Sequence, residues 1–596
     1  MALLKSHNTR CNLCSLGCFV ALAETPRGLV ECEFRQDVPA LRRGVCNRGN
    51  MTAELLRHVR RLLSAKVCRE GSRREVRLDE AVRVVADAVS RCAGSLVIDG
   101  GLPCEDIGAA LTLAAASNGR ISASVYLPPE DESALNGLSA SGAAFFTPED
   151  LATCDAILVV GDAFATHPGI ARPVHEARRH NPRLPLVVVD SIPGRTGIFA
   201  SFPVTVKPGA ESRALAAIAA KAGVTDLGSL VVAENGDAPL NQDLTVNADG
   251  PPQRGASPIS APDAIANAAR VLAGAKKLGV ILRAEPGKAS NWDQVAYLAG
   301  KLAVAKGGGV AACLTCGNAM GAYRLAKAYV AQPLAPTKER PSAEGTTAIT
   351  GEGACATSAR VLIALGTDPA TTRSKSEAAA LNGLKMLVAA NAMPVPTMER
   401  ADVALPMTFN FEAGGTVVTG SGEIITVDSV ADAPGEAVPA GELAGMLAKA
   451  LGIAGVARGF DRAAAERMPK TDASGITGRA QAAPVAVGVG EFVAVTQSDC
   501  IHAHTGSLTS MCAWPQYMAP EPLVAMSATD AATLGVKHNG RVRLVSLEGT
   551  CEGKADVSKM QPAGVVAVSS GFAASRGLFA WTNGRTGPTT VKVERL

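Results

Sequence analysis

Four cysteines near the N-terminus have a spacing that could hold a metal centre. Cys11, Cys14 and Cys18 are separated by two and three residues, and 27 residues lie between Cys18 and Cys46. The alternatives are a zinc site, a disulfide staple, an iron–sulfur cluster, or no shared ligand. Four thiolates suit zinc and a [4Fe–4S] cluster, because both favour soft sulfur donors in a tetrahedral arrangement. Structural zinc usually takes two close pairs of ligands, so three local thiols and one remote thiol favour [4Fe–4S].

A second pair of thiols, Cys313 and Cys316, lies in "CLTCGNAMGAYRLA" (313–326). It could be a redox pair, two ligands of a metal shared with a partner, or two small packed residues. The other cysteines are isolated in the sequence, and we expect them to be buried, since free cysteine is often a core residue. Fifteen cysteines in 596 residues are too few for a disulfide scaffold.

The composition argues against two classes of partner. The chain has 58 basic and 55 acidic residues and a net charge of +3, so bulk electrostatics would not hold a nucleic acid. Its apolar stretches are broken by glycine or charge well before the ~20 residues that a membrane-spanning helix needs. The segment before Cys11 contains no apolar signal core. We therefore expect a cytoplasmic protein with no nucleic-acid partner and no direct membrane insertion.

Short β-rich apolar runs alternate with alanine-rich amphipathic stretches, which is typical of parallel-sheet α/β domains. In the alanine-rich stretches the apolar residues recur at three and four residues, as helices packed on a sheet require. Strands are expected at 95–100, 156–162, 185–190, 278–283, 360–366 and 385–390. Helices are expected between them, at 79–92, 212–222 and 291–303.

Two segments repeat one pattern. "DAILVVGDAFATHP" (155–168) and "ARVLIALGTDPATT" (359–372) each contain a strand that ends in glycine, a polar turn with Asp and Pro, and the start of a helix. In parallel sheets the ligand lies beyond the carboxyl ends of the strands, where glycine lets it approach and the next helix offers free N–H groups. These loops would suit the phosphates of a nucleotide-like cofactor, although a strand followed by Gly-Asp is common in any α/β protein.

The expected fold is a multidomain α/β protein. A small N-terminal [4Fe–4S] domain precedes two doubly wound α/β domains related by the internal pseudo-repeat, and a β-barrel-like domain follows them. Connectors are expected where Pro, Gly, Asp and Asn gather without periodicity. The boundaries are expected at 1–65 (cluster domain), 66–235 (first α/β domain), 236–262 (linker), 263–455 (second α/β domain, with a segment returning toward the cluster), 456–490 (linker) and 491–596 (barrel-like domain).

The spacing Cys-x2-Cys-x3-Cys-x27-Cys, followed by x-Arg-Gly, resembles the N-terminal cluster domain of the molybdopterin oxidoreductase family. That family includes formate dehydrogenases and the large iron–sulfur subunit of NADH:quinone oxidoreductase. The resemblance covers nearly the whole chain, because four later segments are similar to family segments in the same order. They are 77–90, 155–191, 411–424 and 504–546, the last lying in a domain of the molybdopterin-dinucleotide-binding type.

The resemblance implies two cofactors and a set of binding residues. Arg48 would lie between the cluster and a pterin; a surface arginine is the alternative. Molybdopterin guanine dinucleotide is the second cofactor that the family uses, and the departures described next count against it here. The residues that would bind it, at the two strand-end loops and in the barrel-like domain, are Gly161, Asp162, His167, Asp190, Gly366, Asp368, His504, Thr505 and Gly506.

The chain departs from the family's catalytic members at the ligand of molybdenum or tungsten. Aligned on the segment that follows, "VYLPPEDESALNG" (125–137) places Tyr126 where those enzymes have Cys, selenocysteine, Ser or Asp, and Leu127 replaces a histidine. Cys104 lies too early in the chain to substitute, and Cys154 precedes a buried strand. The resemblance is therefore closest to the non-catalytic branch, in which the cluster carries electrons.

Three functions follow from these expectations. The first is an iron–sulfur electron-transfer subunit of a larger soluble redox complex. The second is a catalytic Mo/W bis-pterin oxidoreductase similar to formate dehydrogenase, and the third is an assembly subunit whose cluster serves only folding. The ferredoxin-like domain that begins the NADH:quinone oxidoreductase subunit is missing here, so further redox centres are expected in partner subunits that are flavin or iron–sulfur proteins.

Overall fold

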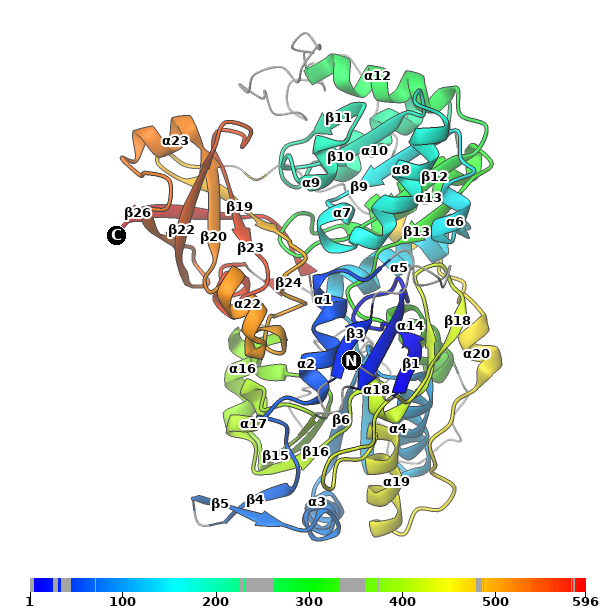
Figure 1. Ribbon diagram of the computed structural model, residues 1–596, viewed down its shortest axis with the longest axis vertical. Coiled ribbons are helices and arrows are strands. Elements are labelled where there is room, and N and C mark those ends of the chain that lie inside the picture. Colours follow the sequence, from blue (N-terminus) through cyan, green and yellow to red (C-terminus); the bar gives the residue numbers. More distant parts are fainter. Residues whose placement is uncertain are drawn as a thin grey trace. The chain divides into compact units, whose positions relative to one another are not determined.

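The structure is a computed structural model (Figure 1). It describes residues 5–24, 30–33, 44–69, 71–225, 227, 230, 261–331, 360–372, 375–478, 485, 487–579, 581–582 and 585–596. The chain forms two units, each assembled from segments that are distant in the sequence. Unit 1 comprises Met1–Pro128, Thr315–Pro469 and Ser507–Ala513, and unit 2 comprises Pro129–Leu314, Lys470–Gly506 and Trp514–Leu596.

Unit 1 contains a small antiparallel sheet and a large, mostly parallel one. The small sheet has the order β1 (Lys5–Arg10), β2 (Phe19–Glu24), β3 (Val30–Glu33). The large sheet has the order β5 (Ser72–Val76), β4 (Ala65–Arg69), β16 (Val403–Pro406), β15 (Met386–Asn391), β14 (Val361–Leu365), β6 (Gly94–Asp99), β7 (Ile121–Tyr126). β14, β15 and β6 are buried almost throughout, as strands covered on both faces must be.

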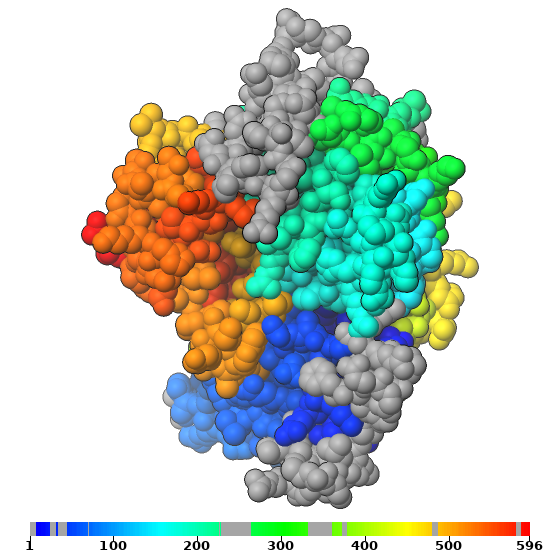
Figure 2. Space-filling model, turned by 45° about the horizontal axis from the view of Figure 1, so that its top comes forward, coloured from blue at the N-terminus to red at the C-terminus, as the bar shows by residue number. Residues whose placement is uncertain are grey.

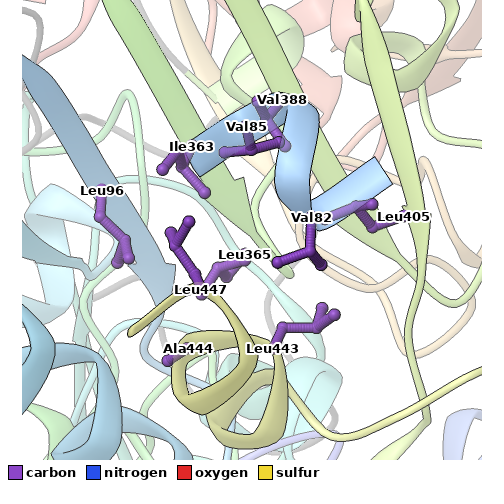
Figure 3. A pocket seen from close by; sticks show the side chains of 10 residues that line it. All are labelled: Val82, Val85, Leu96, Ile363, Leu365, Val388, Leu405, Leu443, Ala444 and Leu447. Atoms are coloured by element: carbon purple, nitrogen blue, oxygen red, sulfur yellow. The ribbon is translucent and has the colours of Figure 1, made fainter. Parts of the chain in front are cut away.

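Helices α3 (Leu78–Arg91) and α19 (Ala440–Ala450) cover part of the large sheet of unit 1. Ten aliphatic side chains enclose a cavity of about 20 Å³ between these helices and the strands (Figure 3). They include Val82 and Leu443 from the helices and Ile363 from the sheet. Because its lining is hydrocarbon, this cavity is a gap in core packing and offers no polar group to a ligand.

Unit 2 contains a parallel sheet and a closed barrel. The sheet has the order β11 (Phe202–Thr205), β10 (Leu186–Asp190), β9 (Ala156–Val160), β12 (Leu278–Leu282), β13 (Gly309–Ala312), β8 (Ala144–Phe145). The barrel has the order β19 (Phe492–Gln497), β23 (Val565–Ser569), β20 (Leu523–Ser527), β22 (Thr550–Ser558), β21 (Arg541–Val545), β26 (Thr589–Arg595).

Two helices of unit 2, α5 (Pro129–Ser141) and α13 (Trp292–Ala305), pack closely against each other. A Cβ atom on Gly137 would lie 2.1 Å from the carbonyl oxygen of Asp293, so only glycine allows this approach. On the barrel, shown in orange and red in Figure 2, Arg543 pairs with Glu552 across β21 and β22. This pair is solvent-exposed and contributes little to stability.

The predicted α/β class and the C-terminal barrel are confirmed. The consecutive α/β boundaries 66–235 and 263–455 do not match the sheets, because β6 and β7 lie in one sheet with β14 to β16, whereas β12 and β13 lie in one sheet with β9. Strand runs reveal which residues are buried but not which strand lies next to which. The predicted linker 236–262 lies outside the described residues except for 261–262.

The second predicted linker, 456–490, is more than a connector. It holds α20 (Arg462–Glu466) and α21 (Ser474–Thr477). The Arg458 guanidinium Nε lies 2.9 Å from the buried carboxylate of Asp106 in α4 (Cys104–Ala116). Among the described residues we find no helix that is both long and apolar enough to cross a membrane.

Candidate functional site

The first three predicted cluster ligands lie in the turn between β1 and β2 of unit 1. The backbone N–H of Cys11 donates a 2.7 Å hydrogen bond to the carbonyl oxygen of Cys18 and closes this turn. Cys46 lies just before the short helix α1 (Asn47–Asn50). Cys11 and Cys14 are buried, and Cys18 and Cys46 are partly exposed. A Cβ atom on Gly49 in α1 would lie 3.5 Å from Cys11 Sγ, so the fold brings the segment that carries the fourth cysteine next to the local three.

The electrostatics of Cys11 reflect this grouping. Burial raises the pKa of the Cys11 thiol well above its ordinary value, and the neighbouring Cys14, Cys18 and Cys46 raise it further. Within the described part of the chain, no group of three or more His, Cys, Asp or Glu is arranged to hold a metal ion. The [4Fe–4S] cluster therefore stays a prediction, and its support is the gathering of four soft donors.

Arg48 is 5% exposed, so the alternative of a surface arginine is wrong. Burial alone would lower the pKa of its guanidinium, but the thiols of Cys14, Cys46 and Cys11 raise it above its ordinary value, and Cys46 also hydrogen-bonds it. A buried cation is costly unless an anion lies near it. Thiolates around a cluster would be such an anion, so Arg48 fits the predicted donor set.

Two other segments of unit 1 hold the cysteine turn. A Cβ atom on Gly17, whose φ is +59°, would lie 2.6 Å from Ile425 Cδ1 in β18 (Ile424–Val427). A Cβ atom on Gly317 would lie 1.8 Å from the carbonyl oxygen of Asn12. The segment predicted to return toward the cluster within 263–455 thus includes Gly317, and its backbone lies directly against the cysteine turn.

The remaining predicted thiols are less suited to chemistry. Cys104 is fully buried at the start of α4, 3.6 Å from the Asn318 amide oxygen, and burial raises its pKa to about 12. Cys313 is fully buried at the end of β13, where its backbone pairs with Leu282. Asn318, which sequence reasoning missed, organises this region by donating to the Leu102 carbonyl and accepting from the N–H of Val418.

In each large sheet, two neighbouring parallel strands are followed along the chain by strands on opposite sides of the pair, which makes the point between them a switch point. In unit 1 this switch point lies between β6 and β14, and in unit 2 it lies between β9 and β12. Ligands of open α/β sheets bind in the crevice outside the carboxyl ends of the strands at such a point. The two loops predicted from the sequence repeat, with Gly161 and Gly366, lie at these two points, and both glycines have positive φ.

The aspartates of the two loops make the same internal bonds. In unit 2, the Asp162 carboxylate accepts from the Thr196 N–H at 2.8 Å and from its hydroxyl at 2.6 Å. In unit 1, the Asp368 carboxylate accepts from the Thr397 N–H at 2.9 Å and from its hydroxyl at 2.5 Å. Each threonine is the second residue of a short helix, α9 (Arg195–Ile198) or α17 (Pro396–Arg400). The predicted pseudo-repeat thus extends to individual hydrogen bonds. We call these two sets of Asp–Thr hydrogen bonds, Asp162–Thr196 and Asp368–Thr397, the shared frame.

Beyond the shared frame, the unit 2 switch point also carries buried charged groups. Lys288 Nζ lies 2.9 and 3.0 Å from the two Asp190 oxygens and 2.6 Å from Glu285 Oε2. Burial penalises the ammonium, but the Asp190 and Glu285 carboxylates raise the pKa of Lys288. Burial raises the pKa of the nearby Glu211 carboxyl to about 8. Neither Lys288 nor the two glutamates were predicted, since no local pattern marks them.

The unit 1 switch point carries one half-buried carboxylate, Asp99, at the end of β6. Its Oδ1 accepts from the Gly101 N–H at 2.6 Å, and burial raises its pKa to about 6. A Cβ atom on Gly101 would lie 2.8 Å from Asp99 Oδ1 and one on Gly366 would lie 3.2 Å from Asp99 Cβ, so both glycines lie against this side chain. Sequence reasoning missed Asp99, although "VIDGG", a strand ending in Asp-Gly-Gly, was a usable signal.

The other predicted binding residues lie in unit 2. His167 is buried, and its ring nitrogens bond Thr166 Oγ1 and the Leu314 carbonyl, both at 2.9 Å. Burial, then the charges of Arg576 and Arg283, hold the pKa of His504 well below its ordinary value. Thr505 is buried, and a Cβ atom on Gly506 would lie 2.0 Å from the Gly571 carbonyl oxygen.

Tyr126, the residue aligned with the metal ligand of catalytic relatives, ends β7 and is 3% exposed. It belongs to an apolar cluster in unit 1 with Val97, Leu362 and Leu387. Leu127, which follows it, is fully buried. Both side chains are part of the core.

Comparisons with known proteins define the class. Residues 494–593 match the family model described as "Molydopterin dinucleotide binding domain". The fold matches a solved structure of acetylene hydratase from Pelobacter acetylenicus over 99% of this chain and 100% of that one, with a TM-score of 0.70 and 11% sequence identity. No curated protein matches the sequence.

The chain therefore has a molybdopterin-oxidoreductase-like fold, and its residues 494–593 are similar to the molydopterin dinucleotide binding domain. The predicted resemblance to the molybdopterin oxidoreductase family is confirmed by these two findings.

Proposed function

We propose that this chain is an iron–sulfur electron-transfer subunit of a larger redox complex. Cys11, Cys14, Cys18 and Cys46 would ligate a [4Fe–4S] cluster, which supplies one-electron transfer when bound. The observation that carries the proposal is the grouping of these four thiols, three of which, Cys11, Cys14 and Cys46, act on the buried Arg48. A fixed cation stabilises the reduced, more negative state, so Arg48 would raise the reduction potential.

Two observations favour electron transfer over catalysis. Tyr126 is packed among aliphatic side chains, where its phenol is a core group. The nearest thiol in sequence, Cys104, is fully buried at the start of α4, where its Sγ lies 3.6 Å from the Asn318 amide oxygen. The aligned region thus offers neither a soft ligand nor the histidine that would stand beside it.

The second candidate is a catalytic Mo/W bis-pterin oxidoreductase, and the family match over residues 494–593 favours it. A third reading is an assembly subunit in which the cluster only stabilises the fold. One cluster alone can only pass electrons between other redox centres. The proposed function therefore requires partner subunits that carry flavin or iron–sulfur centres, and we place the complex in the cytoplasm.

Metal analysis of the purified chain separates these candidates. We expect about four irons per chain and no stoichiometric molybdenum or tungsten. Stoichiometric molybdenum or tungsten with extractable pterin would contradict the proposal. A cluster that no partner complex can reduce or oxidise would support the assembly reading instead.

Substitution of one ligand tests the cluster assignment. Cys14→Ser should abolish the iron content and the electron paramagnetic resonance signal. Cys32→Ser is the matched control, because Cys32 lies in β3 with its Sγ 3.6 Å from the carbonyl oxygen of Asn50, outside the four ligands. Four irons retained in Cys14→Ser, or lost equally in Cys32→Ser, would show that the ligands are assigned wrongly.

A further inference from the structure

A dinucleotide in a doubly wound sheet makes two kinds of polar contact at the switch point. Its pyrophosphate accepts from backbone N–H groups where the glycine turn enters a helix, and an acidic residue at the end of the adjacent strand binds its ribose. In unit 2 these places are the turn after Gly161 and Asp190, the last residue of β10, which neighbours β9.

Protein groups already use the N–H donors of that turn. The Asp162 N–H donates to Glu285 Oε2 at 3.1 Å, and the Phe164 N–H donates to Thr196 Oγ1 at 2.9 Å. The Ala163 N–H donates to the Gly161 carbonyl oxygen at 3.1 Å. Glu285 is fully buried, so a protein carboxylate lies where an anionic ligand would be held.

A protein cation likewise takes the strand-end carboxylate. Lys288 Nζ contacts both oxygens of Asp190, and the Ser191 N–H donates to Asp190 Oδ1 at 2.7 Å. The same ammonium binds Glu285, so it joins the anion-binding turn to the end of β10. Lys288 is 1% exposed.

C-terminal residues of unit 2, from barrel strand β19 and from the separate short strand β25 (Arg585–Thr586) among others, contact the segment that carries these two side chains. Thr496 Oγ1 donates to the Pro286 carbonyl oxygen, and the Gly287 N–H donates to Thr586 Oγ1 at 3.1 Å. A Cβ atom on Gly287 would lie 2.8 Å from the ring of Phe579. These contacts fix the segment after β12 in place.

We propose that Glu285 and Lys288 occupy the unit 2 switch point in place of a nucleotide, so that this half of the fold binds none. The carboxylate takes the N–H donor that a phosphate would take, and the ammonium takes the carboxylate that a ribose would take. This inference does not rest on the electron-transfer function, because it concerns the nucleotide pocket and not the thiols.

Photolabelling tests it on the full-length chain, with 8-azido-GDP as probe and excess GDP as competitor. In the wild type we expect no competable label in the peptides that contain 157–170, 186–196 or 278–290. A competable label in any of them would overturn the inference. Iron content, measured on the same preparation, reports separately on the proposed function.

A double variant gives the positive arm. Glu285→Ala combined with Lys288→Ala frees the N–H donor of Asp162 and the carboxylate of Asp190. We therefore expect the GDP-competable label in these peptides to rise at least tenfold over the wild type. A folded variant, checked by circular dichroism, that gains no label would overturn the inference. If the double variant does not fold, Glu285→Ala alone frees the Asp162 N–H and is subject to the same two outcomes.

Discussion

The two switch points share one frame and differ in what fills it. In each, an aspartate after a positive-φ glycine accepts hydrogen bonds from the N–H and the hydroxyl of a threonine in the first turn of a short helix. In unit 2, Glu285 and Lys288 fill the space beyond this frame with buried charge. In unit 1, glycines and the half-buried Asp99 lie there instead.

The difference shows that a shared frame does not fix a shared role. The Asp–Thr bonds join neighbouring loops of each sheet, so they stabilise the fold whether or not a ligand binds. What a switch point can bind depends on the residues that follow the neighbouring strand, the one across the switch point from the strand that ends in the Gly–Asp loop. That strand is β12 in unit 2 and β6 in unit 1.

The largest effect is expected from removing the buried cation of unit 2. Lys288→Met leaves Asp190 and Glu285 without their ammonium, and breaking a buried ion pair from one side costs about 3–5 kcal/mol. All three tryptophans of the chain lie in unit 2, so the urea dependence of tryptophan fluorescence reports on it. The exposed Lys276→Met should change little, and equal losses in the two variants would refute the buried network.

A smaller effect is expected from the frame that both units share. Thr196→Val and Thr397→Val each remove a buried hydroxyl that donates to aspartate and accepts from a backbone N–H, at a cost of about 1–3 kcal/mol. Unit 2 should suffer more, because Asp368 keeps the hydroxyl donors of Thr371 and Ser507.

Hydrogen exchange of peptides from each unit measures these two losses separately. The exposed hydroxyl of Thr112 provides the control, and Thr112→Val should change stability by less than about 0.5 kcal/mol. If only one of the two threonine variants lost stability, the two units would share a backbone shape but not a stabilising Asp–Thr hydrogen bond.

The smallest effect concerns Asp99. Its pKa is about 6 in the folded chain against an ordinary value of 3.8, so the folded state holds the extra proton between these pH values. Stability therefore falls as pH rises from about 4 through 6. Asp99→Asn, which keeps the acceptor for the Gly101 N–H, should be more stable at pH 7 by about 1 kcal/mol, less than the full shift implies because the carboxylate is partly solvated. Unfolding midpoints of wild type and variant that fail to converge below pH 4 would contradict this sign.

The sequence predicted what is local and missed what is brought together by folding. The spacing of Cys11, Cys14 and Cys18 and the strand–Gly–Asp repeat lie within short segments, so they could be recognised directly. The partners Asp190 and Lys288 are 98 residues apart, and "AEPGKASNW" (284–292) contains nothing that marks its lysine as buried. Burial of this kind depends on the pairing of β10, β9 and β12, which strand patterns do not specify.

The predicted α/β domain boundaries differ from the observed sheets for the same reason. Apolar runs predict strands, and most expected strands lie within a few residues of those observed, such as β9 and β14. The order of the strands in each sheet depends on long connections in which the chain leaves one unit and later returns to it. Periodicity within an apolar run carries no information about such connections.

A potentiometric titration followed by electron paramagnetic resonance tests the central claim most directly. On the full-length chain we expect one signal of a reduced [4Fe–4S] cluster that appears in a single one-electron step, vanishes in Cys14→Ser and persists in Cys32→Ser. Arg48→Met should keep the signal and lower its midpoint potential. A molybdenum or tungsten signal, or no iron–sulfur signal in the wild type, would contradict the account.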